Sequence, residues 1–168
     1  RIVDRWRPTT VCEETASPLL DLFDSIQTTK ARQSREIKMR DLDSFRPLYD
    51  PTAVQPMRDE LTRVGVDELR TSEDVDGALG SSEGTVLLVV NSVCGCAAGN
   101  ARPGVMLALQ NEVIPDRLTT VFAGQDKEAT DKARGYMAEY PPSSPCIAVF
   151  QDGKVHTIIE RHNIEGRS

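Results

Sequence analysis

A run of apolar, largely β-branched residues from Thr85 to Val93 (TVLLVVNSV) constrains the fold more than any other segment. Apolar side chains occupy consecutive positions, which is typical of a central parallel strand covered by helices on both faces. A helical pattern runs from Ala97 to Val113, and Pro103 is expected to break or kink that helix. The pattern predicts a buried strand that leads into a helix with almost no linker.

The segments around this strand alternate between helical and extended patterns. A capping box of Thr71 and Asp74 is expected to open one helix, and Asp126 is expected to cap another. Asp152 is expected to form a hairpin turn with the following glycine. The remaining expectations are a helix from Pro51 or Pro56 to Val64, and strands at Asp67 to Arg70, Leu118 to Gly124, Cys146 to Phe150 and Val155 to Glu160. This order predicts an α/β domain with a mixed sheet. A helix that covers the sheet is expected after the hairpin, but the sequence stops at Ser168.

Charge divides the chain into an N-terminal extension, residues 1–48, and a domain, residues 49–168. The extension has a net charge of +1 and the domain −7, which gives −6 for the whole chain. The extension holds an apolar cluster from Leu19 to Ile26 and a basic stretch over residues 30–40, and it is expected to be partly helical or disordered. A docking arm for an acidic partner is the alternative.

The overall composition argues against two classes of partner. A net negative charge disfavours nucleic acid. The longest unbroken apolar run, Val86 to Val90, is far too short to span a bilayer, so no membrane association is expected.

Four cysteines stand at positions 12, 94, 96 and 146. Two are isolated and two are nearly adjacent, so the spacing is not that of a disulfide framework. A reducing, cytoplasmic setting is the simpler inference, and in that setting reactive or metal-binding thiols are the ones of interest.

The chemistry is predicted at Cys94-Gly95-Cys96, where the buried strand becomes a helix. Unpaired N–H groups at the start of the helix favour the thiolate of Cys94, which is the form that attacks disulfides. Cys96 is close enough to resolve a mixed disulfide, and Gly95 allows the backbone the freedom that a small ring needs. Such a ring is expected to be strained, which favours thiol exchange or isomerisation over bulk reduction.

Several separated blocks of the sequence resemble one known family. The segment NSVCGCAAGNARP (Asn91 to Pro103), followed by VFAGQDKEAT, PSSP and RHNIEG in the same order, is similar to the bacilliredoxins, which have a thioredoxin-like fold and a Cys-Gly-Cys centre. The resemblance runs from about Leu48 to Gly166. It implies a three-layer fold with a central mixed sheet flanked by helices, from which the family's C-terminal helix is missing here.

The resemblance also implies a reaction. Cys94 would attack the mixed disulfide between a client protein and bacillithiol, a low-molecular-weight thiol that acts as co-substrate; no other cofactor is implied. Cys96 or a second thiol would then clear the adduct. Pro145 fits the cis-proline beside the dithiol, which leaves the backbone of Ser144 open to an extended substrate. Asn91 and Gly95 are interpreted as residues that support the motif. Isomerase activity on protein disulfides is the alternative activity.

Other residues are weighed between structural and functional roles. Cys146 is expected to be inert packing, with an auxiliary thiol as the alternative. Arg102 is expected to be solvated, with binding of an anionic thiol as the alternative. Gly99 and Gly104 suggest close packing of the helix against neighbouring strands.

Two function hypotheses from other classes remain open. The CGC thiols could bind a metal together with Cys146 or His162, although a structural zinc site usually draws on more than one tight pair, so no metal is expected. His156 and His162 are otherwise expected to have surface roles. The chain could instead be a non-catalytic interaction module that uses the basic stretch as its arm.

Overall fold

The computed structural model describes residues 46–80 and 83–166. Contacts within the chain divide it into two units, residues 1–44 and 45–168, and the described residues belong to the second. The predictions for Cys12, for the apolar cluster from Leu19 to Ile26 and for the basic stretch fall outside the described residues.

Helices and strands alternate along the described chain, as the sequence pattern predicts. The elements are α2 (Pro51–Thr62), β1 (Asp67–Glu68), α3 (Ser72–Leu79), β2 (Thr85–Asn91), the π-helix η2 (Ala97–Ala101), α4 (Arg102–Ala108), β3 (Arg117–Phe122), α5 (Lys127–Gly135), β4 (Cys146–Gln151), β5 (Lys154–Ile159) and α6 (Arg161–Ile164).

The five strands form one mixed sheet in the order β1-β3-β2-β4-β5. Strand β3 pairs in parallel with both β1 and β2, whereas β4 is antiparallel to both β2 and β5. Strand β2 is therefore central, as predicted, with a parallel neighbour on one side and an antiparallel neighbour on the other. This strand order and these directions are the thioredoxin-like arrangement that the resemblance implies, so the predicted fold class is confirmed.

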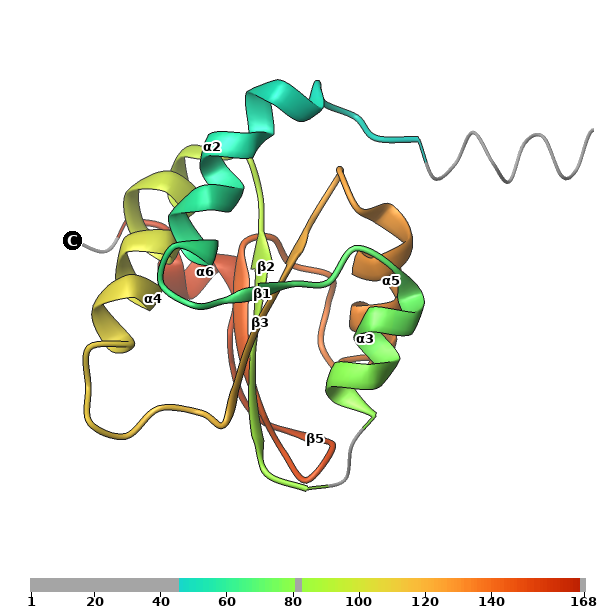
Figure 1. Cartoon of the computed structure of the whole chain (residues 1–168), viewed down its shortest axis with the longest axis vertical. Coiled ribbons are helices and arrows are strands. Elements are labelled where there is room, and N and C mark those ends of the chain that lie inside the picture. The colour runs from blue at the N-terminus through green and yellow to red at the C-terminus, as the bar shows by residue number, and fades with distance from the viewer. Residues whose placement is uncertain (1–45, 81–82, 167–168) are drawn as a thin grey trace, which may run out of the picture. The chain divides into compact units, whose positions relative to one another are not determined.

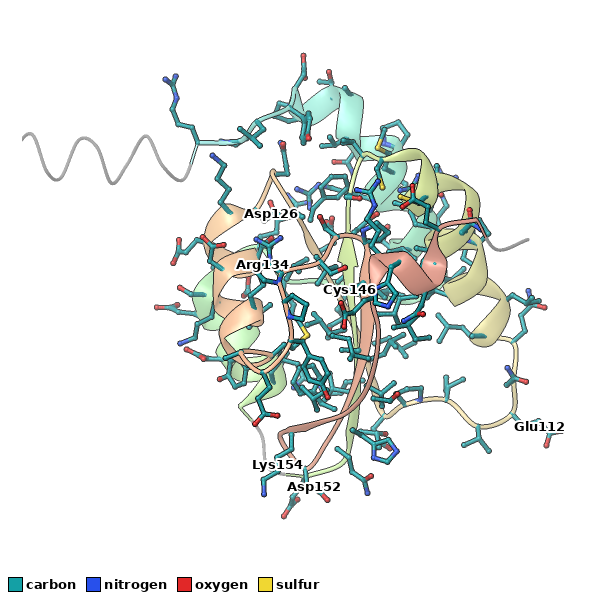
Figure 2. The ribbon with its side chains drawn as sticks, turned by 180° about the vertical axis from the view of Figure 1, so that it is seen from behind. Glu112, Asp126, Arg134, Cys146, Asp152 and Lys154 are labelled. Carbon is teal, nitrogen blue, oxygen red and sulfur yellow. The ribbon has the colours of Figure 1, made fainter. Side chains whose placement is uncertain are left out.

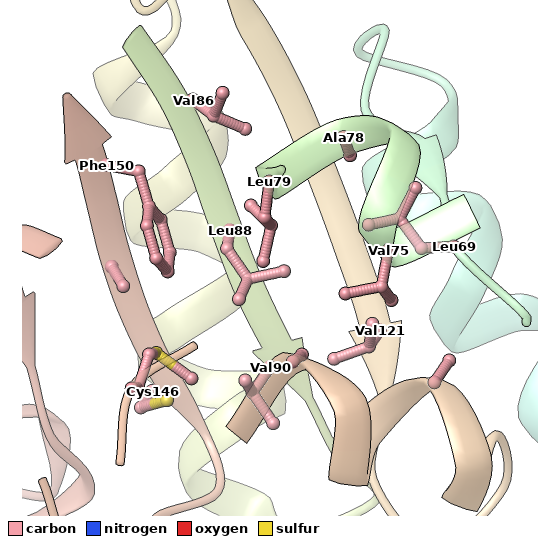
Figure 3. Packing of buried hydrophobic residues seen from close by; sticks show 14 of the residues in the cluster. Leu69, Val75, Ala78, Leu79, Val86, Leu88, Val90, Val121, Cys146 and Phe150 are labelled. Atoms are coloured by element: carbon pink, nitrogen blue, oxygen red, sulfur yellow. The ribbon is translucent and has the colours of Figure 1, made fainter. Parts of the chain in front are cut away.

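Helices cover both faces of the sheet (Figure 1), with α3 and α5 on one side and α2 and α4 on the other. Side chains of β2 alternate between two buried clusters. Leu88 and Val90 pack with Phe150 and Val121 under α3 and α5, as Figure 3 shows. On the other face, Leu87 and Val89 pack with residues of α2 and α4, including Leu61 and Val105. Burial on both faces explains why β2 is apolar at consecutive positions.

Local signals in the sequence correctly predict where several elements begin and turn. The Asp50 side chain accepts a hydrogen bond from the N–H of Thr52 and caps α2, which begins at Pro51. Thr71 and Asp74 form both hydrogen bonds of the predicted capping box. Asp152 and the glycine after it both have positive φ, 51° and 75°, as a tight hairpin turn between twisted strands requires.

The helix after the dithiol differs from its predicted form. It ends at Ala108 instead of Val113, and the irregularity predicted near Pro103 is a change from the π-helix η2 to α4. The change of helix type falls between Ala101 and Arg102, next to Pro103 in the first turn of α4. A proline is tolerated there because the first N–H groups of an α-helix lack intrahelical partners.

Two further expectations are wrong. The Asp126 side chain makes no cap hydrogen bond in α5; its two carboxylate oxygens accept hydrogen bonds from Arg58 instead, both at 2.8 Å. Gly99 and Gly104 do not mark close packing, because a Cβ added to either would meet nothing within 4 Å. Both glycines line a cavity of about 540 Å³, together with apolar side chains that include Ile147 and Ile164.

The described chain after β5 contains one further short helix, α6. Its Ile164 is buried, and the backbone N–H of Arg161, its first residue, donates a hydrogen bond to Ser143 Oγ at 2.8 Å. That contact ties α6 to the segment that leads into β4. Within residues 46–80 and 83–166, no helix has the length and apolar character needed to cross a membrane.

Candidate active site

The two thiols of the CGC motif lie between the end of β2 and the start of η2. Strand β2 is held on both sides by β3 and β4 up to Asn91 and Val90, so the sheet places the residues that follow it. The N–H groups of Ala97 and Ala98 then bond to the carbonyl of Cys94 at 3.1 and 3.2 Å, which turns the chain into the helix. Both cysteines are free and partly exposed, and their sulfurs are 2.8 Å apart.

Three donors surround the Cys94 sulfur. Cys96 Sγ lies at 2.8 Å, Ser92 Oγ at 3.2 Å and the backbone N of Ala97 at 3.4 Å. Burial by itself would raise the pKa of Cys94, but the hydrogen bonds from these three groups and the positive charge of Arg161 outweigh it. The pKa of Cys94 therefore lies below that of an ordinary thiol, and the fraction of thiolate at neutral pH is increased.

Cys96 is perturbed in the opposite direction. Its hydrogen bond to Cys94, then its partial burial and the charge on Cys94, raise the pKa of Cys96, although Arg161 acts to lower it. The contact between the two sulfurs allows either thiol to donate, and the opposite pKa directions correspond to Cys96 as donor and Cys94 as acceptor. The pair thus combines one thiol with a lowered pKa and one with a raised pKa.

Gly95 shows no requirement for glycine while both thiols are free. The φ angle of Gly95 is not positive, and a Cβ atom at this position would meet nothing within 4 Å. With both thiols free, the backbone does not require glycine here; its part in closing a disulfide ring stays a prediction.

Asn91 lies at the base of the site and is almost fully buried. Its Nδ2 donates to the carbonyl of Met57 in α2 at 3.2 Å, and its Oδ1 accepts from the N–H of Ser92 at 2.8 Å. Oδ1 also accepts from Arg102 Nη1 at 3.1 Å. Asn91 therefore joins α2, the end of β2 and α4, and its role in supporting the motif stays a prediction.

Arg102 occupies a different place from either of its predicted ones. It is 2% exposed, with its guanidinium directed to Glu60, Asn91 and the carbonyl of Ser92. Because these partners enclose the side chain, it is neither solvated nor open to an anionic thiol. The position of this arginine within a helix gave no sign of its partner Glu60, which is distant in sequence.

The Ser144–Pro145 peptide bond is cis, as predicted. Val90 pairs with Cys146 in the antiparallel β2–β4 register, so the residues before Cys146 continue alongside the chain that leads to the dithiol. Ser144 is half-buried and lines a polar pocket of about 390 Å³ that also includes Arg161. Pairing of Ser144 with a substrate backbone stays a prediction.

Cys146 lies in the core beneath α5, in contact with the cluster that contains Val90 and Phe150 (Figures 2 and 3). It is 2% exposed, and burial raises its pKa to about 11. Its thiol is thus almost entirely protonated at neutral pH, which favours the packing role over that of an auxiliary nucleophile.

Sequence reasoning missed two residues of the site, Ser92 and Arg161. Ser92 lies two positions before Cys94 in the same sequence block, and the short spacing between a hydroxyl and a thiol could have indicated a hydrogen bond between them. Arg161 opens the RHNIEG block, but nothing local to that block indicates the distant cysteines whose pKa values it lowers.

The other polar residues considered earlier do not join the dithiol in a metal site. His156 and His162 are both exposed, and His162 Nδ1 lies 3.7 Å from the Glu160 carboxylate. No group of three or more His, Cys, Asp or Glu side chains in the described part of the chain is placed to hold a metal ion. The cluster around Cys94 is instead suited to nucleophilic thiol chemistry.

Comparison with known proteins agrees with this chemistry. Residues 49–168 match the model of the disulphide isomerase family. The chain is 52% identical over 121 residues to a bacilliredoxin of Koribacter versatilis, covering 72% of this chain and 83% of the relative. It is 54% identical over 121 residues to a bacilliredoxin of Cytophaga hutchinsonii, covering 72% and 89%.

Solved structures of thioredoxins are also similar to the chain. The thioredoxin of Fasciola hepatica has a TM-score of 0.43 and 18% identity over 56% of this chain and 86% of that one. Thioredoxin O2 of Arabidopsis thaliana, in its oxidized state, has a TM-score of 0.42 and 19% identity over 58% and 84%.

The fold and the paired thiols define a thiol–disulfide oxidoreductase. The matches to the family model and to the relatives show that the chain belongs to the bacilliredoxin family.

Proposed function

We propose that the chain removes a low-molecular-weight thiol, bacillithiol, from mixed disulfides on client proteins, with Cys94 as the nucleophile. The observation that carries the proposal is the set of three donors around the Cys94 sulfur, which lowers its pKa while that of Cys96 is raised. Relatives that are more than 50% identical to this chain over the aligned residues are bacilliredoxins, and this supports the choice of co-substrate.

The first step is an exchange without net oxidation. The Cys94 thiolate attacks the bacillithiol sulfur of the client's mixed disulfide, a new S–S bond forms and the old one breaks. The client sulfur leaves as a thiolate and takes up a proton, so the client departs with a free thiol. The groups that donate hydrogen bonds to Cys94 stabilise its thiolate before the attack. They lose their charged acceptor when the new S–S bond forms, because the sulfur is then neutral.

The second step clears Cys94. Cys96 loses its proton and attacks the Cys94 sulfur, which releases bacillithiol as a thiol and leaves a Cys94–Cys96 disulfide. Two further low-molecular-weight thiols would reduce that disulfide and become oxidised to their own disulfide. Alternatively, a second low-molecular-weight thiol attacks the bacillithiol sulfur of the adduct, which forms a disulfide between the two small thiols and releases Cys94 as a thiolate, so that Cys96 takes no covalent part. We place the cycle in a reducing cytoplasm, where such thiols are the available reductants.

Isomerisation of protein disulfides is the second candidate function. The description of the matching family model, disulphide isomerase, favours it. The same Cys94 thiolate would attack a protein disulfide, and the resulting mixed disulfide would be resolved by a thiol of the client instead of by bacillithiol.

Intact-mass analysis of the Cys96→Ala variant tests the proposal. The variant is incubated with a carrier protein bearing one mixed disulfide with either bacillithiol or glutathione, and adducts are mapped by peptide mass to distinguish Cys94 from Cys12 and Cys146. We expect a single adduct on Cys94 that forms faster from the bacillithiol carrier. The Cys94→Ser variant is the matched control, and it should remain unmodified at position 94.

Two results would change the conclusion. Equal rates from the two carriers would favour a general exchange or isomerase role. No adduct on Cys94 from either carrier would refute this residue as the nucleophile.

A further inference from the structure

Arg102 is a buried cation beside the active site that the exchange chemistry does not use directly. It is 2% exposed, and its Nε donates to the Glu60 carboxylate at 2.7 Å. Glu60 itself is 38% exposed, so the ion pair has one partner in the interior and one near solvent. A buried arginine needs compensation for its lost hydration, and only part of that compensation comes from the carboxylate.

The remaining hydrogen bonds of Arg102 go to the segment directly before the nucleophile. Its Nη1 donates to the side-chain Oδ1 of Asn91 and to the backbone carbonyl of Ser92, both at 3.1 Å. The same Asn91 oxygen accepts the N–H of Ser92 at 2.8 Å. Both backbone polar groups of Ser92 are therefore bonded, one to Asn91 and one to Arg102.

This anchoring decides where the Ser92 hydroxyl lies. Ser92 follows the last residue of β2 and precedes the helix, so neither element's own hydrogen bonds hold it. With its N–H and C=O both fixed, its Oγ lies 3.2 Å from the Cys94 sulfur, to which it donates. A hydroxyl on a free loop would lose this geometry to rotation and to competing water.

We propose that Arg102 is a positioning residue for thiol–disulfide exchange, because together with Asn91 it fixes the backbone of Ser92 and so holds the Ser92 hydroxyl on the Cys94 sulfur. The inference rests on the proposed role of Cys94 as the nucleophile. Arg102 acts through Ser92 and not by its own charge: the cation whose charge lowers the pKa of both thiols is Arg161.

A double-mutant cycle on the full chain tests this relation. Alkylation of Cys94 by iodoacetamide is followed by peptide mass across a range of pH in the wild type, Ser92→Ala, Arg102→Lys and the double variant. Lysine keeps the charge, but its single nitrogen cannot take the place of both Nε, which bonds to Glu60, and Nη1, which bonds to Asn91 and Ser92. Loss of the Ser92 donor is expected to slow alkylation at pH 6 about threefold, since the smaller thiolate fraction is partly offset by greater reactivity of each thiolate.

We expect Arg102→Lys to slow alkylation at pH 6 by two- to threefold. In the Ser92→Ala background the same substitution should cause no further slowing, because the effects of two residues that act through one another do not add. Independent, multiplied effects in the double variant would overturn the proposal, and so would an unchanged profile in Arg102→Lys. The alkylation assay needs no bacillithiol, so its outcome is separate from that of the trapping experiment for the proposed function.

Arg58 supplies a matched control for a merely structural loss. It is also buried, at 6% exposure, and it bonds to Glu68 and Asp126 at 2.7 to 2.8 Å, but none of its hydrogen bonds reaches Ser92 or Cys94. Arg58→Lys is expected to lower the melting temperature and to leave the pH profile of Cys94 unchanged. A profile altered as much as that of Arg102→Lys would show that general loosening is responsible and would refute the positioning role.

Glu60→Gln keeps the proposal testable if Arg102→Lys does not fold. The glutamine leaves Arg102 in place but removes the charge that orients its guanidinium. We expect a smaller slowing, about twofold, that disappears in the Ser92→Ala background. Slowing of the same size in both backgrounds would overturn the proposal.

Discussion

Replacing Cys96 by alanine and by serine separates its hydrogen bond to Cys94 from its role as a resolving thiol. Neither replacement can form a disulfide, but serine keeps a donor close to the position from which the Cys96 thiol acts at 2.8 Å. The hydrogen bond from Cys96 is the strongest of the influences that lower the pKa of Cys94. We therefore expect the pKa of Cys94 to rise in Cys96→Ala and to stay low in Cys96→Ser.

The size of the effect follows from the exposure of the pair. A hydrogen bond to a charged group contributes about 1.5–3 kcal/mol, and the low end applies because both sulfurs are partly exposed. Since about 1.36 kcal/mol is a tenfold change in a protonation equilibrium, the alanine variant should have about one tenth of the thiolate at a pH below the pKa. Each thiolate should in turn be about threefold more reactive.

These two changes give the alanine variant a distinctive pH–rate profile. Alkylation of Cys94 should be about threefold slower than in the serine variant at low pH and about threefold faster at high pH, so the two curves cross. Peptide mass after timed treatment with iodoacetamide, between about pH 5 and 10, measures both arms. Coincident curves for the alanine and serine variants would refute the assignment of Cys96 as donor. Parallel curves that never cross would indicate a change in access to the sulfur instead.

Two further predictions concern the charge beside the thiols and the buried cysteine. Arg161→Gln should slow alkylation of Cys94 at pH 6 about twofold and make the rate independent of salt, because the half-exposed charge that lowers the pKa of Cys94 is gone. Lys154→Gln, at the hairpin turn (Figure 2), is the control, and it should leave the alkylation rate and its salt dependence unchanged. Cys146, with its pKa raised to about 11, should have roughly one thiolate in a thousand at pH 8 and remain unmodified in the folded protein while Cys94 reacts fully. Labelling of Cys146 at the rate of Cys94 without denaturant, seen by peptide mass, would contradict its burial.

The parts of the fold that the sequence predicts are those whose signals are local. The consecutive apolar residues of β2 predict its burial on both faces, because a strand covered by helices on each side needs apolar side chains on each side. The capping box of Thr71 and Asp74 lies within four residues, and the turn at Asp152 and Gly153 depends on two residues that can adopt positive φ. Together with the order of the elements, these signals are enough to predict an α/β domain with a mixed sheet, whereas the thioredoxin-like arrangement is what the family resemblance implies.

Polar residues whose partners are distant in sequence escape such reasoning. Asp126 precedes a helix and so resembles a cap, but its carboxylate bonds to Arg58 in α2. Arg102 lies on a helix and so resembles a solvated side chain, but Glu60 and the end of β2 enclose it. In both cases the local pattern indicates which hydrogen bonds a side chain could form. The packing of α2 against the rest of the domain determines which partner it bonds to.

The reactivity predicted for Cys94 has a partly different cause in the structure. From the sequence, the start of the following helix was expected to lower the pKa of Cys94 through its unpaired N–H groups. The structure provides one such group at the sulfur, the Ala97 N–H at 3.4 Å, while the Ala98 N–H bonds to the Cys94 carbonyl. The side chains of Cys96 and Ser92 lower the pKa more than that N–H group does.

The helix that follows Cys94 and the side chains around its sulfur act together. Residues 95–108 are helical without a break, first in the π form over η2 and then in the α form of α4. The aligned peptide units of this helix favour a negative charge at its start, where Cys94 lies. The side chains that add to this effect are a thiol two residues after Cys94 and a hydroxyl two residues before it. The spacing of one residue between the cysteines serves this arrangement, because it brings the second sulfur within hydrogen-bond distance of the first while both are still reduced.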